Sequence, residues 1–227
     1  KVFLRKAFLH HEETMRKRDV LITGLEARLY DVLLLAGTAG LYQVLITRAV
    51  RDLGIRPSDR ILDMGAGTGK NAVLMSRRLD GGSITTMDIS AQMLAQLHRK
   101  AARHPWIRPL ELSIDGDLPF RKEFDKVVLF FVLHGFPQPR RERILDNAFR
   151  ALKPGGTVHL LDWSRMDLAR RGPLLRLFFR YVECDQAADF VTRDAEAMLR
   201  AAGFFGLQAQ LYAGGLLRML AGTRAAG

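Results

Sequence analysis

Cysteine is nearly absent from the sequence, since Cys184 is the only one among 227 residues. A single thiol excludes an internal disulfide and a metal cluster built from several thiolates, so we expect an intracellular, cytoplasmic protein in which Cys184 serves packing. Long apolar runs are missing as well. The longest, Val32 to Ile46, is interrupted by Gln43 and falls short of the roughly 18 residues that span a bilayer. The sequence therefore predicts a protein that is soluble or touches a membrane only at its surface.

Acidic residues are outnumbered: 24 Asp and Glu stand against 35 Lys and Arg, which gives a formal net charge of +11. A field of this sign attracts anionic partners, among them nucleic acid, acidic lipid and phosphorylated small molecules, and does not choose among them. Hydrophobic residues make up 48% of the chain, which excludes extensive disorder. The length fits one compact domain and is too short for two full ones.

From residue 60 onward, short apolar segments alternate with helical patterns. Strands are predicted over residues 60–65, 83–90, 107–115, 124–134 and 157–164, and helices over residues 70–79, 91–103 and 140–152. This alternation is typical of parallel βαβ units with helices on both faces of the sheet. Residues 1–55 show helical spacing instead, so we expect an N-terminal helical cap on a domain of residues 56–227.

The stretch ILDMGAGTGK places Gly65, Gly67 and Gly69 at alternating positions directly after the first predicted strand. In a doubly wound sheet, ligands bind beyond the carboxyl ends of the strands, and glycines let the backbone approach them closely. The spacing fits neither the dinucleotide fingerprint nor the phosphate-binding loop, because Lys70 occupies the sixth position and Asn71 follows the Gly-Lys pair. The turn is predicted to bind a different ligand, and a turn without a ligand is the alternative.

Two acidic residues flank this turn. Asp63 lies near the end of the first predicted strand, where a carboxylate would repel a pyrophosphate but could bind an ammonium group. Asp88 closes the second strand, at roughly the 20-residue interval at which an acid grips ribose hydroxyls in such folds. A ligand with a ribose, a cationic amino-acid end and no pyrophosphate fits S-adenosylmethionine. A helix N-terminal role is the alternative for Asp88, although Ser90 is the better cap.

Five motifs, ILDMGAGTGK, TTMDIS, SIDGDLPF, FDKVVLFFVLH and LKPGG, resemble in this order those of class I S-adenosylmethionine-dependent methyltransferases over residues 59–164. The resemblance implies a doubly wound, mostly parallel seven-stranded sheet, the Rossmann-like methyltransferase fold, and S-adenosylmethionine as cofactor. It also assigns roles: Asp63, Gly65 and Gly67 at the methionine end, Asp88 at the ribose, Ile89, Met93, Asp115 and Gly116 around the adenine, and Phe131 and His134 facing the reacting centre.

The two ends of the chain are similar to the ubiquinone/menaquinone biosynthesis C-methyltransferases. LRAAGFFGLQAQLYAGGLLRMLAG resembles their carboxyl-terminal helix, strand and Gly-Gly hairpin, and ARLYDVLL resembles their amino-terminal Tyr-Asp segment. By this resemblance Tyr30 closes over the cofactor. It implies an apolar or aromatic small molecule as methyl acceptor, such as a quinol or a lipid-like compound.

His134, in the segment VLHGF, is the predicted catalytic residue, either as a base or by orienting the acceptor. A histidine that only shapes the pocket is the alternative. His-Gly-Phe-Pro replaces the Asn or Asp with Pro-Pro that holds a flipped base, which disfavours methylation of nucleic-acid bases. No metal site is predicted, because His10-His11-Glu12-Glu13 lacks the ligand spacing of a helical metal site.

The function predicted from the sequence is therefore methylation of an apolar or aromatic small molecule by a methyltransferase that uses S-adenosylmethionine. Basic and apolar residues are mixed in residues 170–182, which allows peripheral contact with an acidic membrane. Two alternatives stay open. An RNA or protein methyltransferase is favoured by the charge, and a non-catalytic binding protein could have kept the cofactor fold as a scaffold.

Overall fold

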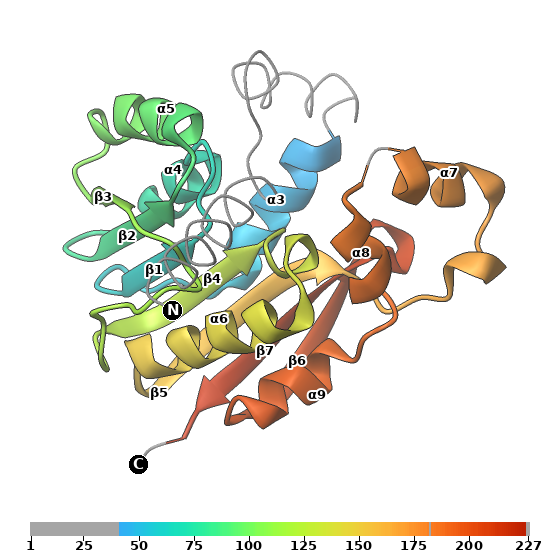
Figure 1. Ribbon diagram of the computed structural model, residues 1–227. Coiled ribbons are helices and arrows are strands. Elements are labelled where there is room, and N and C mark those ends of the chain that lie inside the picture. The colour runs from blue at the N-terminus through green and yellow to red at the C-terminus, as the bar shows by residue number, and fades with distance from the viewer. Residues whose placement is uncertain (1–40, 182, 226–227) are drawn as a thin grey trace, which may run out of the picture.

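The structure, a computed structural model, describes residues 41–181 and 183–225 (Figure 1). Tyr30 and most of the predicted cap lie outside the described residues. The strands are β1 (Arg60–Met64), β2 (Ser83–Asp88), β3 (Ile107–Glu111), β4 (Phe124–Phe130), β5 (Leu152–Trp163), β6 (Phe204–Tyr212) and β7 (Leu217–Arg224). The α-helices are α3 (Leu41–Asp52), α4 (Lys70–Ser76), α5 (Ala91–Ala101), α6 (Gln138–Ala151), α7 (Pro173–Tyr181), α8 (Asp185–Phe190) and α9 (Ala195–Ala201), and the 3-10 helices are η1 (Leu133–Gly135), η2 (Leu168–Arg170) and η3 (Ala213–Gly215).

The seven strands form one sheet in the order β3-β2-β1-β4-β5-β7-β6. Strands β1 to β5 pair in parallel, and β7 runs antiparallel to both of its neighbours. The predicted doubly wound, mostly parallel seven-stranded sheet is thus confirmed. Because the chain leaves β1 toward β2 and later returns to pair β4 with β1, the strand order reverses at β1. Ligands bind at such a switch point in open α/β sheets.

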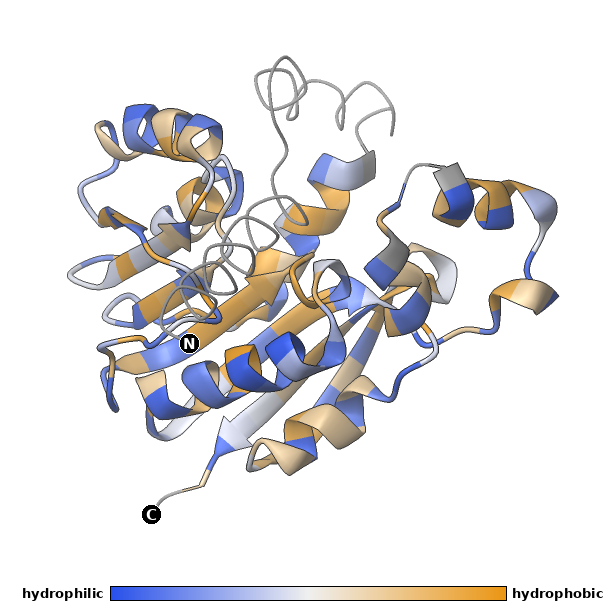
Figure 2. Ribbon diagram, viewed as in Figure 1, coloured by the Kyte–Doolittle hydropathy of each residue, from blue (hydrophilic) through white to orange (hydrophobic). Residues whose placement is uncertain are grey.

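Helices cover both faces of the sheet, and the side chains of the central strand β4 pack against helices on both faces. Val127 and Leu129 are fully buried in a cluster with residues of α6 and α9, whereas Val128 and Phe130 pack with residues of α3, α4 and α5. Successive residues of a strand point to opposite faces, so the part of β4 that is covered on both sides, residues 127–130, is apolar at every position. Figure 2 shows hydrophobic residues concentrated on the central strands and a mixture of polar and apolar residues along α6.

Helix α7 projects beyond the edge of this layered body (Figure 1). Its Leu174 and Leu177 are 82% and 56% exposed, while Phe179 on the same helix is buried. Within residues 41–181 and 183–225, none of the helices is long and apolar enough to cross a bilayer.

Strand β4 ends earlier than the apolar run predicts. It stops at Phe130, because Phe131 has a φ of +57° and turns the chain out of the extended conformation into η1. His134 therefore lies in η1, beyond the carboxyl end of the strand. Strand β5 starts at Leu152 rather than at Thr157, so the KPGG segment lies within it.

Candidate cofactor and acceptor site

The glycine turn after β1 is held against the end of β2 by backbone hydrogen bonds. Gly65 and Ala66 donate their N–H groups to the carbonyl oxygen of Met87, each at 2.9 Å. Gly67 donates its N–H to Asp88 Oδ2 at 2.8 Å. The turn and the carboxylate that closes β2 therefore form one unit at the carboxyl edge of the sheet.

The glycines in this turn meet two different demands. Gly65 has a φ of +79°, and a Cβ placed there would lie 2.8 Å from Cγ2 of Val132, so the protein itself fills the space beside it. Gly67 has a φ of +54°, and a Cβ there would have no heavy atom within 4 Å. Both positions need a backbone that L side chains rarely adopt. At Gly67 the backbone borders open space in which a ligand can approach it.

Asp88 is fixed by the backbone around it. Its Oδ1 accepts hydrogen bonds from the N–H groups of Ile89 and Ser90 at 2.8 and 2.9 Å, and its Oδ2 accepts from Gly67. A carboxylate has about four lone-pair directions, so these three bonds leave capacity for a hydroxyl of a ligand. Ser90, not Asp88, caps α5, because its Oγ accepts from the N–H of Met93.

Asp63 is only 1% exposed, and its Oδ2 has no hydrogen-bond partner in the part of the chain that the structure describes. Burial, and secondarily the negative charge of Asp88, raise the pKa of Asp63 from 3.8 to about 7. A buried carboxylate without a partner is costly unless a cation or a donor meets it. The ammonium group of S-adenosylmethionine would satisfy this demand. Gly67 leaves open space in which the cofactor can approach the backbone, and Asp88 can accept a hydrogen bond from its ribose, so the residues present fit this cofactor.

The residues predicted to surround the adenine differ in their burial and in their hydrogen bonds. Ile89 is half-buried after the end of β2, and Met93 is buried in α5. Asp115 is fully buried, with Ser113 Oγ donating to its Oδ1 at 2.5 Å and Arg140 Nε donating to its Oδ2 at 2.6 Å. An adenine amino group would have to share the Asp115 carboxylate with these partners.

Gly116, the other residue predicted near the adenine, closes the turn that contains Asp115. It donates its N–H to the carbonyl oxygen of Ser113 at 3.1 Å. Its own carbonyl oxygen accepts from Asn147 Nδ2 at 2.8 Å. The two hydrogen bonds fix the backbone of this turn.

Phe131 lies directly after β4, with a backbone conformation that is unusual for a bulky residue. Its N–H donates to the carbonyl oxygen of Leu161 in β5 at 2.8 Å, and its φ is +57°. Its ring centroid lies 6.0 Å from that of Tyr42 in α3. Residues held in such sparsely populated conformations cluster at functional sites.

His134 makes two hydrogen bonds to Asp162, which lies next to the last residue of β5. His134 Nδ1 donates to Asp162 Oδ1 at 2.7 Å, and the backbone N–H of His134 donates to Asp162 Oδ2 at 3.2 Å. The other ring nitrogen, Nε2, lies 3.8 Å from Glu183 Oε2. Burial acts to lower the pKa of His134, but the charge of Asp162, the hydrogen bond to it and the charge of Glu183 outweigh burial and raise that pKa.

Three residues of this region were not predicted from the sequence as site residues: Asp162, Trp163 and Glu183. An acidic residue at the carboxyl end of a fifth parallel strand is a signal that could have pointed to Asp162. Glu183 follows α7 without any motif around it. Trp163 Nε1 donates to Glu183 Oε1 at 3.0 Å, and the Trp163 ring packs edge-on against Phe178 and Phe179 at centroid distances of 5.9 and 5.1 Å. Long-range folding alone joins these side chains to His134.

Comparison with known proteins adds independent information. Residues 61–156 match the family described as "Methyltransferase domain". The uncharacterized methyltransferase sll0829 of Synechocystis sp. is 28% identical over 172 residues, which cover 75% of this chain and 78% of that protein. The demethylmenaquinone methyltransferase of Tropheryma whipplei is 35% identical over 137 residues, 59% of this chain. These residues span 54%, about half, of the length of the Tropheryma protein.

Among solved structures, the fold is similar to that of a methyltransferase from Thermotoga maritima described as S-adenosylmethionine-dependent and as a possible histamine N-methyltransferase. The TM-score is 0.65 at 21% identity, and the match covers 88% of this chain and 97% of that one. At this identity the likeness supports the fold alone. The family match, by contrast, runs from the glycine turn through the KPGG segment and contains Asp63, Asp88 and His134.

Proposed function

We propose that this chain, a class I S-adenosylmethionine-dependent methyltransferase, transfers the methyl group to an apolar or aromatic small molecule, with a quinol ring as the leading example. The observation that carries the proposal is the aromatic group of Trp163, Phe178 and Phe179 beside the polar pair of His134 and Asp162. Aromatic side chains with a few fixed polar groups are what an apolar acceptor with one or two oxygen atoms requires.

In this proposal the cofactor lies across the carboxyl ends of β1 and β2. Asp63 meets the ammonium group, the backbone at Gly65 and Gly67 borders the methionine end, and Asp88 accepts from the ribose hydroxyls. Ile89, Met93, Asp115 and Gly116 surround the adenine, and Phe131 borders the sulfonium. The support is the unpartnered Oδ2 of Asp63, the open space at Gly67 and the remaining lone-pair capacity of Asp88.

Methyl transfer from a sulfonium is an in-line displacement, so the main task of the protein is to align donor and acceptor. His134 stands in η1, whose neighbour Val132 contacts the side of the glycine turn at Gly65. Asp162 fixes the ring through two hydrogen bonds. We assign His134 the role of orienting a polar atom of the acceptor next to the methyl group.

The name of the Tropheryma relative supports the choice of a quinone-like ring as acceptor, because that protein is described as a demethylmenaquinone methyltransferase. The exposed Leu174 and Leu177 of α7 lie on the same helix as the aromatic residues Phe178 and Phe179. An apolar tail on the acceptor would find apolar side chains along this helix.

We further propose that the enzyme meets its acceptor at an acidic membrane surface. Two grooves of about 540 and 530 Å³ lie along α3, α4 and α5 and share Gln43. The charged residues that line them, in the part of the chain that the structure describes, are all basic: Arg48, Arg51, Lys70, Arg77, Arg78, Arg99, Lys100 and Arg103. Such a surface is attracted to anionic lipid headgroups.

The test of the proposed function is to follow the methyl group. The purified protein is incubated with methyl-labelled S-adenosylmethionine and a cell extract, which is then separated into lipid, nucleic-acid, protein and aqueous fractions. Label in the lipid fraction is expected, and demethylated quinols are the first pure acceptors to try. Label in the nucleic-acid or protein fraction would replace the proposed acceptor by that class, and cofactor binding without any transfer would favour a scaffold role.

A further inference from the structure

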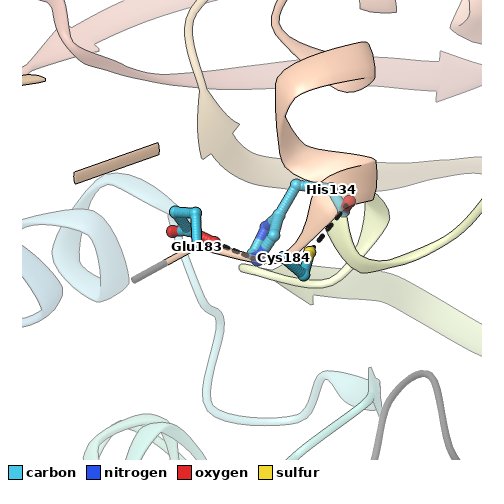
Figure 3. A group of neighbouring side chains, drawn as sticks. All are labelled: His134, Glu183 and Cys184. Atoms are coloured by element: carbon cyan, nitrogen blue, oxygen red, sulfur yellow. Dashed lines mark hydrogen bonds and ion pairs between the residues drawn. The ribbon is translucent and has the colours of Figure 1, made fainter. Parts of the chain in front are cut away.

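The side chains of His134, Glu183 and Cys184 converge beyond the carboxyl end of β4 (Figure 3). One ring nitrogen of His134, a carboxylate oxygen of Glu183 and Cys184 Sγ lie within 4.8 Å of one another, and no other group of three such side chains does so among residues 41–181 and 183–225. We infer that this His134–Glu183–Cys184 cluster binds a divalent transition-metal ion, and that zinc fits it best.

The histidine is prepared for this role by its contact with Asp162. Since Nδ1 donates to Asp162 Oδ1 at 2.7 Å, the neutral ring has its lone pair on Nε2, which faces Glu183. Metal-binding histidines almost always donate their second ring nitrogen to a carboxylate or a carbonyl group, which fixes the tautomer and the ring orientation. The backbone N–H of His134 binds the other oxygen of Asp162 at 3.2 Å and holds the main chain as well.

The glutamate is prepared in the same way by Trp163. Trp163 Nε1 donates to Glu183 Oε1 at 3.0 Å, which leaves Oε2 directed toward His134 Nε2 at 3.8 Å. The side chains of His134 and Glu183 are 15% and 16% exposed. Two donor atoms from segments far apart in the chain thus face each other, and each is held by a partner behind it.

The distances and the donor types suit zinc. Bonds of about 2.0–2.2 Å to nitrogen and oxygen and 2.3 Å to sulfur in a tetrahedral arrangement separate the donor atoms by roughly 3.3–3.7 Å, and a nitrogen–oxygen pair by roughly 3.3–3.5 Å. His134 Nε2 and Glu183 Oε2 are 3.8 Å apart, and all three donor atoms lie within 4.8 Å, so the side chains must rotate inward to bind the ion. A mixed nitrogen, oxygen and sulfur set favours zinc over magnesium or calcium, which prefer oxygen alone.

Three protein ligands leave a fourth position open, which is the arrangement of catalytic rather than structural zinc sites. The cluster lies beside the cofactor turn, because Val132, two residues before His134, packs against Gly65. We assign the open position to an oxygen or sulfur atom of the acceptor, so that His134 orients the acceptor through the ion. This use of the ion rests on the proposed function, whereas the binding of the ion does not.

The sequence alone predicted no metal site, because the ligands come from segments 50 residues apart and Cys184 is the single cysteine. Cys184 Sγ has a weak contact with the carbonyl oxygen of His134 at 3.7 Å, so it is already directed toward the segment that carries the histidine. Packing was the role predicted for it. The geometry points to a ligand role instead.

The test uses the whole chain and the metal ions themselves. The chain is stripped with a chelator and titrated with Zn²⁺ by calorimetry, then loaded with Co²⁺ and examined by absorption spectroscopy. We expect one ion per chain and a thiolate-to-cobalt charge-transfer band in the near ultraviolet. Cys184→Ser should abolish the band, and Asp162→Asn should weaken Zn²⁺ binding by roughly 10–100-fold through the histidine that it orients.

Two control variants separate this site from adventitious binding. His98→Ala removes an exposed histidine of α5, and His10→Ala with His11→Ala removes the adjacent pair near the start of the chain; both should keep the stoichiometry and the band. A Co²⁺ complex without a thiolate band, or a band that survives Cys184→Ser, would overturn the proposal. So would binding that disappears with His10 and His11.

Binding of S-adenosylmethionine to the same samples distinguishes this proposal from the proposed function. Cys184→Ser should retain cofactor binding, which also shows that the variant is folded. Metal binding without methyl transfer to any lipid would sink the proposed acceptor and leave the metal site standing. Methyl transfer to lipid by a protein that binds no metal would overturn the metal site and support the proposed acceptor.

Discussion

Gly67 donates its backbone N–H to Asp88 Oδ2 at 2.8 Å, and this bond joins the glycine turn after β1 to the end of β2. The same carboxylate accepts from the N–H groups of Ile89 and Ser90. The carboxylate of Asp88 therefore fixes the glycine turn and the segment that leads into α5, and it can still accept a hydrogen bond from a ribose hydroxyl. This is why Gly67 and Asp88, 21 positions apart in the sequence, belong to one site.

Binding of S-adenosylmethionine should release protons near neutral pH through Asp63. In the free protein its pKa is about 7, so about half of the molecules have a neutral Asp63 at pH 7. The ammonium group of the cofactor favours the carboxylate, which lowers that pKa and expels the proton. Calorimetric titrations at pH 7 in phosphate and in Tris should differ in heat for the wild type and agree for Asp63→Asn. Equal heats for the wild type would contradict the contact.

The same pKa has a consequence for the stability of the free protein. An acid whose folded pKa is raised contributes stability that is present below its ordinary pKa and is lost as the pH rises through the folded value. Asp63 should therefore lower the free energy of unfolding between about pH 4 and pH 7, by no more than about 4 kcal/mol. Urea unfolding of the wild type and of Asp63→Asn across this range measures the effect, which should be absent in the variant.

His159 should make the protein sensitive to acid. It is 6% exposed in β5, its Nδ1 has no partner in the described part of the chain, and burial, helped by the charge of Lys126, lowers its pKa to about 3. A base whose folded pKa is lowered contributes stability that is present above its ordinary pKa of 6.5 and is lost as the pH falls toward 3. The cost at pH 5 is about 2 kcal/mol.

The measurement is the difference in unfolding free energy between pH 7 and pH 5. The value at pH 7 minus the value at pH 5 should be about 2 kcal/mol lower in His159→Gln than in the wild type, because Asp63 contributes equally in both proteins. His98→Gln, at an exposed position of α5, serves as the control and should leave the difference unchanged. An unchanged pH dependence in His159→Gln would show that His159 does not carry it.

Alanine at Gly65 and at Gly67 should have different effects. Either substitution places an L residue at positive φ, at a cost of about 1–2 kcal/mol. At Gly65 the new Cβ also meets Cγ2 of Val132 at 2.8 Å, so the loss of stability should be larger there. At Gly67 the Cβ enters open space, so cofactor affinity should fall more than stability.

Urea unfolding and cofactor titration of both variants test this difference. Shortening the neighbour in the double variant Gly65→Ala with Val132→Ala should recover part of the stability lost in Gly65→Ala, measured against Val132→Ala alone. Equal losses in the two glycine variants without recovery would mean that Val132 does not restrict the turn.

Reversing the charge of the basic grooves should weaken contact with acidic lipid. Arg99 and Arg103 are exposed on and after α5 and line the larger groove. Arg99→Glu with Arg103→Glu should reduce cosedimentation with phosphatidylglycerol vesicles, and binding to phosphatidylcholine vesicles should stay low throughout. The control, Arg143→Glu with Arg200→Glu, makes the same charge change on α6 and α9 at the opposite face of the sheet. RNA binding in place of vesicle binding would contradict the membrane contact.

The parts of the fold and site that the sequence predicts are local. The parallel strands with helices on both faces follow from the alternation of strands and helices, and the glycine turn follows from a spacing within ten residues. Asp88 is recognisable because it closes a strand at a fixed interval from that turn. Ser90 was identified as the cap of α5 for a similar reason, and the structure confirms it.

The parts that the sequence did not predict depend on contacts between distant residues. His134 stands out as a residue type, but its partner Asp162 is 28 residues away on β5. Asp115 is predicted to touch the adenine, yet Arg140, 25 residues later, already engages its carboxylate. Phe131 continues an apolar run and still leaves the strand with a φ of +57°, although its N–H bonds to the carbonyl oxygen of Leu161 on β5.

The most direct test of the central claim, that the carboxyl edge of β1 and β2 holds the cofactor, is a calorimetric titration of S-adenosylmethionine into the wild type, Asp88→Asn and Glu111→Gln. Glu111 is the register partner of Asp88 on β3 and is exposed, so it is the matched control. We predict one bound cofactor per chain, an affinity weakened at least about tenfold, or about 1.4 kcal/mol, by Asp88→Asn, and no change in Glu111→Gln. An unchanged affinity in a folded Asp88→Asn would contradict the account.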